Sequence, residues 1–122
     1  MLALCLTALT CGGRQGLPEA VFALDACGEA FGIGLTDEAN IARAVQLLSQ
    51  DGESIVSGRL ARGDGGFNSP WSWHLRPETV SFAETSIEVC DGCPRFVESN
   101  LPYWVDNLGR FCPIVRVTKR IR

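Results

Sequence analysis

Apolar and polar residues alternate over several segments of the chain, and this two-residue period is typical of strands with one buried face. Residues 21–25 and 30–36 are two such segments, and the turn residues 26–29 between them predict an antiparallel hairpin. Further strands are expected over 54–61, 71–75 and 79–89 and at the C-terminus. The residues predicted to face the core are Phe31, Ile33 and Leu35 in the second strand and Val115, Val117 and Ile121 in the last, where Arg116, Thr118, Arg120 and Arg122 face solvent.

Two segments have the longer period of amphipathic helices. The first runs from a cap at Thr36 or Asp37 to about Gln50, with Asp51-Gly52 as its stop, and the second begins at Pro94 and runs to about Asn100. Their expected buried stripes are Ile41, Val45 and Leu48 in the first helix and Phe96, Val97 and Leu101 in the second. The order of elements, ββαβββαβ, predicts an α+β domain: a mostly antiparallel sheet with two helices packed on one face.

Length and charge limit the classes of function. The chain has 122 residues, 46% of them hydrophobic and 20% charged. This is ordinary for one globular unit, so residues 17–122 are predicted to form a single α+β domain. Eleven basic against fourteen acidic residues give a formal charge of -3. No net field therefore favours nucleic acid or an anionic membrane surface as a partner.

Residues 1–16 are predicted to be an export signal or a lipoprotein leader. Their apolar run of about ten residues is too short to cross a bilayer but has the length of the hydrophobic region of a signal. The run ends at Cys11-Gly12-Gly13, which is similar to a lipoprotein cleavage box in which Cys11 carries the lipid. A plain signal cut near Gly16 is the alternative. Both predict an extracellular or periplasmic domain that meets a membrane only through a lipid anchor.

The most specific segment is Asn68-Ser-Pro-Trp-Ser-Trp-His-Leu-Arg-Pro77, followed by Ile87-Glu-Val-Cys-Asp91, Phe96-Val-Glu98 and Phe111-Cys-Pro113. Through these motifs the chain resembles, from Phe22 to its end, the N-terminal-like domain of a calmodulin-binding protein that is also described as an inhibitor of hormone-sensitive lipase. That family has small secreted bacterial members. Two positions depart from its pattern: Arg76 stands where an Asp is usual, and Ile114 stands where a Trp is common. The resemblance implies a protein-binding domain and supplies no catalytic residue.

Four cysteines are expected to form structural disulfides. Cys90 and Cys112 belong to the pattern of the resembling family, and an exported chain meets an oxidising compartment, so these two are expected to pair. Cys27 and Cys93 lie outside that pattern and occur together, which suggests that they pair with each other. The alternative takes Cys90 and Cys93 as the CxxC pair of a small thiol–disulfide oxidoreductase. A zinc site with Cys90, Cys93, Cys112 and His74 is disfavoured by the oxidising location.

The loop over 62–70 is dense in turn residues and is predicted to present a binding surface on a rigid scaffold. The candidate binding residues in and after it are Phe67, Asn68, Trp71, Trp73 and His74. In the alternative, purely structural interpretation, Trp71 and Trp73 are core residues and His74 is a hydrogen-bonded sheet residue. A Ser–His–carboxylate triad would need His74, but the sequence has no nucleophile-elbow motif.

Together these features predict an exported, disulfide-stabilised module that binds another protein. Inhibition or regulation of a hydrolase is the role that the resemblance implies. We expect no catalytic residue, no metal and no cofactor. Thiol–disulfide exchange by Cys90 and Cys93 is the competing function.

Overall fold

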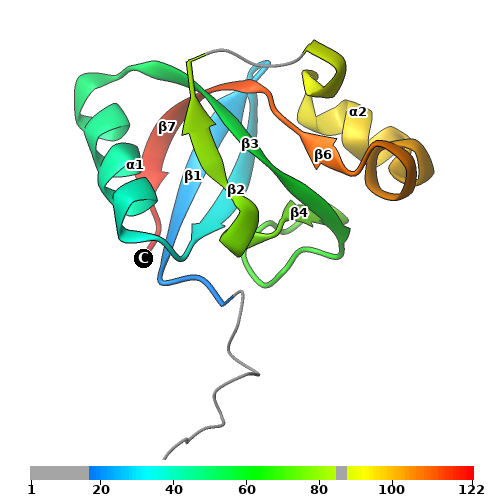
Figure 1. Cartoon of the computed structure of the whole chain (residues 1–122), viewed down its shortest axis with the longest axis horizontal. Coiled ribbons are helices and arrows are strands. Elements are labelled where there is room, and N and C mark those ends of the chain that lie inside the picture. Colours follow the sequence, from blue (N-terminus) through cyan, green and yellow to red (C-terminus); the bar gives the residue numbers. More distant parts are fainter. Residues whose placement is uncertain (1–16, 85–87) are drawn as a thin grey trace, which may run out of the picture.

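The computed structural model describes residues 17–84 and 88–122, which form a curled sheet with helices packed against it (Figure 1). The strands in these residues are β1 (Ala20–Ala26), β2 (Glu29–Leu35), β3 (Glu53–Arg62), β4 (Trp73–Leu75), β5 (Ser81–Ala83), β6 (Arg110–Phe111) and β7 (Ile114–Arg120). The helical segments are α1 (Glu38–Gln50), α2 (Pro94–Ser99), the π-helical η4 (Pro102–Leu108) and the 3₁₀ turns η2 (Pro77–Thr79) and η3 (Glu88–Cys90). The expected leader over 1–16, with Cys11, lies outside the described residues.

The sheet is antiparallel, and its main path runs β2-β1-β7-β3-β4, with β5 and β6 also paired to β3. β1 and β2 form the predicted hairpin and pair from Ala20↔Leu35 to Ala26↔Glu29. The turn between them requires positive φ at Cys27 (57°) and Gly28 (77°), the geometry that matches the twist of a tight hairpin. The expected α+β class, with its mostly antiparallel sheet and two disulfides, is confirmed.

Both helices pack against one continuous hydrophobic core, with α1 near β7 and α2 near β2 on opposite sides of the view in Figure 1. Aromatic rings occupy its centre: the Trp73 ring centroid lies 5.7 Å from that of Phe31 and 5.4 Å from that of Phe111. The aliphatic core residues around them include Leu24, Ile33, Leu35, Val56, Leu75, Val115 and Val117 from the strands, Ala44 and Leu47 from α1 and Val97 from α2. The alternation in β1, β2, β3 and β7 therefore selects the buried face, as predicted.

The strand predicted over 79–89 does not form. Residue 79 ends the 3₁₀ turn that Pro77 begins, β5 contains three residues, and Glu88–Cys90 form another 3₁₀ turn. β3 pairs with β5 over Ile55–Ser57 and with β4 over Leu60–Arg62 on its way to the loop. Ala83 pairs with Ile55, and β3 begins at Glu53, so a strand that continued toward residue 89 would run past the end of its partner. β4 is also shorter than expected and begins at Trp73.

Two apolar helix residues predicted to be buried are exposed. Val45 of α1 is 42% exposed and Phe96 of α2 is 44% exposed. In α1 the buried face is centred on Ala44 and Leu47, one position away from the predicted stripe. In α2 Val97, which belongs to the predicted stripe, is buried together with Pro94. Helical periodicity placed both helices, but the buried face of α1 is rotated from the predicted stripe.

Ile121 is the third exposed exception, because a bulge reverses the alternation of the last strand. Leu24 pairs with Val117, but the preceding residue Ala23 pairs with Lys119, so β7 carries one extra residue. Beyond the bulge the core side is occupied by Arg120, whose guanidinium carbon lies 5.4 Å from the Phe22 ring centroid. Ile121 consequently lies on the outer face of the sheet.

Candidate functional site

The outer face of β2 carries only small side chains. Its inward residues are Phe31, Ile33 and Leu35, and its outward residues are Ala30, Gly32 and Gly34. The 63–70 loop lies on this face: a Cβ at Gly32 would collide with the Phe67 carbonyl oxygen, and a Cβ at Gly34 would lie 3.3 Å from Phe67 Cε2. The two glycines therefore let the loop backbone and the Phe67 ring approach the sheet closely.

Asn68 connects this loop to β2 and β4, the first and last strands of the main sheet order. Its Oδ1 accepts a hydrogen bond from the Gly32 N–H of β2 at 2.6 Å, and its Nδ2 donates to the Trp73 carbonyl of β4 at 2.7 Å. The side chain is 1% exposed. A single buried amide thus connects β2 to β4 where the curled sheet would otherwise leave two open edges.

Further polar contacts hold the base of the loop. The Trp71 indole Nε1–H donates to the Ala30 carbonyl at 2.8 Å, and the Ser72 N–H donates to Glu98 Oε1 of α2 at 2.8 Å. His74 Nδ1 lies 2.8 Å from the Gly63 carbonyl oxygen, and its ring meets the Phe67 ring edge-on at 5.6 Å. The loop is therefore anchored to β2, β4 and α2 at once.

An open groove of about 270 Å³ lies between the loop and the outer face of β1 and β2. Its lining combines Phe67, Ser69 and Pro70 of the loop with Ala23, Ala30 and Gly32 of the strands and with Ile121. The surface is mostly apolar, and the anchored loop gives it a fixed wall. Such a groove can accept an apolar side chain of a partner, whereas the lining offers no titratable side chain for catalysis.

The structure places the predicted binding residues at different depths. Trp73 is fully buried in the core and Asn68 is buried beneath the loop, so both shape the site from inside. Phe67 is half-buried because it packs over Gly34 and against His74. Trp71 and His74 are also half-buried. Of the five, Phe67 lines the groove directly.

Sequence reasoning missed the strand side of the groove. Ala23, Ala30, Gly32 and Ile121 line it, yet none was a candidate binding residue. Part of this surface has a signal in the sequence: in β2, small residues alternate with large apolar ones, which indicates that something packs closely on the outer face. The position of Ile121 has no such signal, because it depends on the bulge in β7.

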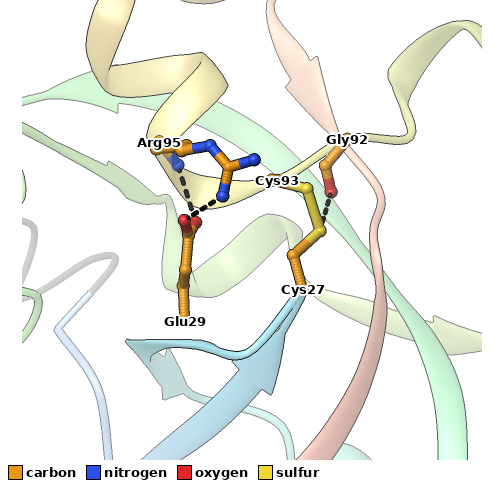
Figure 2. Close-up of a disulfide and its surroundings, with 5 residues drawn as sticks. All are labelled: Cys27, Glu29, Gly92, Cys93 and Arg95. Carbon is orange, nitrogen blue, oxygen red and sulfur yellow. Dashed lines mark hydrogen bonds and ion pairs between the residues drawn. A yellow bond between two sulfur atoms is a disulfide. The ribbon is translucent and has the colours of Figure 1, made fainter.

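The Cys27–Cys93 disulfide joins the β1–β2 turn to the start of α2 (Figure 2). Beside it Glu29 holds Arg95: the Arg95 backbone N–H donates to Oε1 at 3.0 Å and Nη1 donates to Oε2 at 2.7 Å. The side-chain hydrogen bond from Arg95 lowers the pKa of Glu29 below its ordinary value, against the opposing effect of desolvation. A covalent bond and a charged pair thus clamp α2 to the hairpin.

Cys90 pairs with Cys112, and together with Cys27–Cys93 this gives the two expected disulfides. Cys90 and Cys93 therefore belong to different bridges and do not form the CxxC disulfide that the oxidoreductase interpretation requires. Among the residues that the structure describes, no three His, Cys, Asp or Glu side chains are grouped so that they could hold a metal ion. The Trp73 indole Nε1–H is buried and has no hydrogen-bond partner among the residues that the structure describes.

Two disulfides indicate that the chain folds in an oxidising compartment outside the cytoplasm. None of the helices in the described residues has the length and hydropathy that a membrane crossing requires.

Comparison with known proteins identifies the domain. No curated protein and no solved structure gives a significant match. A family model described as the BP-74 N-terminal domain matches residues 18–121, which include every strand and helix described above. This match supports the expected relationship to the calmodulin-binding-protein-like domain. The chain belongs to the family of the BP-74 N-terminal domain.

Proposed function

We propose that this domain is an exported protein-binding module, and that its groove receives an apolar side chain of a hydrolase that it inhibits or regulates. The observation that carries the proposal is the groove formed by Phe67, Ser69 and Pro70 against Ala23 and Ala30. The module acts by binding and carries out no reaction of its own. Its partner is a protein, and neither nucleic acid nor a cofactor takes part.

The rigidity of the groove supports a binding role. Asn68 and Trp71 tie the loop to β2, and Ser72 ties its base to α2, by hydrogen bonds of 2.6 to 2.8 Å. A loop held in its binding conformation before the partner arrives loses little conformational entropy on association. The half-buried Phe67 ring lines the groove, and aromatic residues dominate the energy of many protein interfaces.

Export is the second part of the proposal. The two disulfides support it, because such bonds persist in oxidising compartments. We further propose that Cys11 carries a lipid that anchors the domain to a membrane. Replacing Cys11 with Ser should then release the protein from the membrane fraction. Unchanged partitioning, with a mature terminus beyond Gly13, would leave only an ordinary export signal.

Inhibition can be tested with a substitution that fills the groove. Ala30 is exposed and lines the groove, so Ala30→Gln should obstruct it without removing any core packing. Ala42→Gln introduces the same side chain at an exposed position of α1 and is the matched control. The assay follows hydrolysis of a short-chain ester by an enzyme of the hormone-sensitive lipase type as the domain is titrated in.

We expect the native domain and Ala42→Gln to inhibit the enzyme equally and Ala30→Gln to inhibit about tenfold less, the effect of losing about 1.4 kcal/mol of binding free energy. Phe67→Ala should weaken inhibition in the same direction. Equal inhibition by all four proteins would show that the groove is not the contact surface. Absence of inhibition by the native domain would remove this enzyme class from the proposal.

A further inference from the structure

Three arginines stand side by side on neighbouring strands. Arg59 of β3 lies directly opposite Arg110 of β6. On its other side, the backbone N–H of Arg76 donates to the Arg59 carbonyl at 2.8 Å, which continues the β3–β4 register one residue beyond Leu60↔Leu75. Arg59 is therefore the middle member of a cross-strand series, Arg76–Arg59–Arg110, which we call the arginine row.

The arginine row faces outward. Side chains directly opposite each other in an antiparallel pair share a face, and the next pairs along these strands, Leu60↔Leu75 and Gly58↔Phe111, are buried. All three arginines are exposed. The guanidinium groups therefore lie on the surface of the sheet that faces away from the core.

No carboxylate neutralises this row within the part of the chain that the structure describes. The ion pairs found there involve Arg43, Arg62, Arg95 and Arg116. Arg110 donates one Nη2 hydrogen bond to the hydroxyl of Ser57 at 2.6 Å, which orients its guanidinium and leaves the charge uncompensated. Like charges directly opposite each other on neighbouring strands destabilise a sheet, so folding alone gives no reason for this arrangement.

We propose that the arginine row binds a ligand that carries several phosphate or sulfate groups. Cross-strand neighbours lie roughly 5 Å apart, so the row spans about 10 Å and can meet two or three such groups in succession. Each guanidinium presents a planar fork of N–H donors that matches an oxyanion in a bidentate manner. Ten of the eleven basic residues of this chain are arginines, the residue type suited to that contact.

The net charge of -3 does not oppose the proposal, because the contact depends on local geometry. Exposed charges farther apart than a Debye length, about 8 Å in physiological salt, are largely screened from the ligand. Glu78, the acidic residue closest to Arg76 in sequence, forms no ion pair with the row in the described structure. The row is also separate from the groove, whose lining contains none of its members, so the two proposals stand or fall independently.

The test titrates the full chain with inorganic tripolyphosphate and, in a second arm, with phosphatidylcholine vesicles that contain or lack phosphatidylserine. Arg59→Gln and Arg110→Gln each remove one guanidinium from the row. Arg122→Gln changes the net charge equally at an exposed position outside it and is the matched control. Binding is measured by calorimetry or sedimentation, and the Nε–Hε NMR signals of the arginines report which side chains are contacted.

We expect Arg59→Gln and Arg110→Gln to weaken binding about tenfold, as loss of a charge-assisted hydrogen bond predicts, and Arg122→Gln to change it less than about twofold. Row-dependent binding of tripolyphosphate supports a free anion as the ligand, and row-dependent binding confined to phosphatidylserine vesicles supports a lipid headgroup. Failure to bind either probe overturns the proposal. Equal losses in all three variants do so as well, because they would reflect net charge alone.

Discussion

The Asn68 side chain takes the place of a backbone ladder between β2 and β4. Edge strands leave backbone N–H and C=O groups that need partners, and β2 presents the N–H of Gly32 and the C=O of Ala30 on its free edge. Asn68 Oδ1 accepts from the first and Trp71 Nε1–H donates to the second. These two side chains satisfy backbone groups on the free edge of β2 and hold the loop that forms one wall of the groove.

Asn68→Ala should therefore destabilise the domain well beyond an ordinary surface substitution. The change leaves the Gly32 N–H and the Trp73 carbonyl without their partner, and each buried unsatisfied group costs about 1–3 kcal/mol. We expect a total loss of about 2–6 kcal/mol in the free energy of unfolding, measured by chemical denaturation. The control Asn107→Ala removes an exposed amide and should change stability by less than about 0.5 kcal/mol. Equal stability of the two variants would contradict the bridging role of Asn68.

Substitutions of Trp73 and Phe67 should affect different properties: Trp73→Ala mainly the stability of the domain, and Phe67→Ala mainly partner binding. Trp73 is fully buried, so Trp73→Ala is expected to cost about 3–5 kcal/mol. Phe67 is half-buried and lines the groove, so Phe67→Ala should cost about 1–2 kcal/mol, part of the transfer free energy of a buried aromatic side chain. Thermal unfolding of both variants, alongside partner binding at a temperature where each is folded, checks this. A Phe67→Ala domain as unstable as Trp73→Ala would make the loop purely structural.

The roles of these residues were only partly visible in the sequence. Asn68, Trp71 and Trp73 belong to its most specific segment, and that pattern marked the correct part of the chain. The sequence pattern could not distinguish the role of Asn68, whose buried amide hydrogen-bonds to β2 and β4, from that of Phe67, whose ring lines the groove. That distinction depends on contacts with β2, whose residues lie more than thirty positions away along the chain.

At the level of elements, α2 is a short helix held by its surroundings. It has six residues, too few for a helix to be stable alone in water. The Cys27–Cys93 disulfide, the Glu29–Arg95 pair and the bond from Ser72 to Glu98 attach it to the β1–β2 turn and to the base of the loop. Local sequence determines where α2 starts, at Pro94, and tertiary contacts keep it folded.

The two disulfides should differ in accessibility. Cys27 is exposed, whereas Cys90 and Cys112 are buried. A mild dithiol reductant followed by alkylation and peptide mapping should therefore label Cys27 and Cys93 first. The paired substitution Cys27→Ser/Cys93→Ser opens a loop of 66 residues, and the loop-entropy model predicts a loss of about 4 kcal/mol. Non-reduced mapping that finds Cys90 joined to Cys93 would contradict the pairing and favour the redox function.

The Glu29–Arg95 pair should make stability depend on pH on the acid side. Because Arg95 lowers the pKa of Glu29 in the folded state, the pair stabilises the fold above the pKa of Glu29 in the unfolded chain. That contribution disappears as the pH falls through the lower pKa of the folded state. Arg95→Gln should raise the pKa of Glu29 in an NMR titration and flatten the acid limb of stability against pH. Arg122→Gln is the control, and a Glu29 titration unaffected by Arg95→Gln would refute the assignment.

Most elements follow from sequence patterns, and the exceptions have tertiary causes. The hairpin, α1 and the start of α2 follow from alternation, helical spacing and turn residues. The predicted strand over 79–89 fails because its C-terminal part would run past Glu53, where its partner β3 begins. The helical segment Pro102–Leu108 was not predicted, although it buries Trp104 against Phe111, with ring centroids 5.7 Å apart.

At the scale of the whole molecule, the curl of the sheet creates the candidate site. It brings β2 close to β4, and the 63–70 loop spans the gap on the outside while the aromatic core fills the inside. The bulge in β7 adds Ile121 to the same outer surface. No single segment of the sequence contains this surface, which is why the groove could be predicted only from its loop side.

Photocrosslinking from the groove tests the proposed function most directly. A photoreactive amino acid replaces Ala30, which lines the groove, or Ala42, an exposed residue of α1 that does not. After irradiation in the native exported fraction, the variant at position 30 should form a covalent adduct with one protein, a hydrolase, and the adduct should disappear when Phe67→Ala is introduced into the same chain. The variant at position 42 should form none. Adducts of equal yield from both positions, or an adduct at position 30 that survives Phe67→Ala, would contradict the groove as the partner-binding surface.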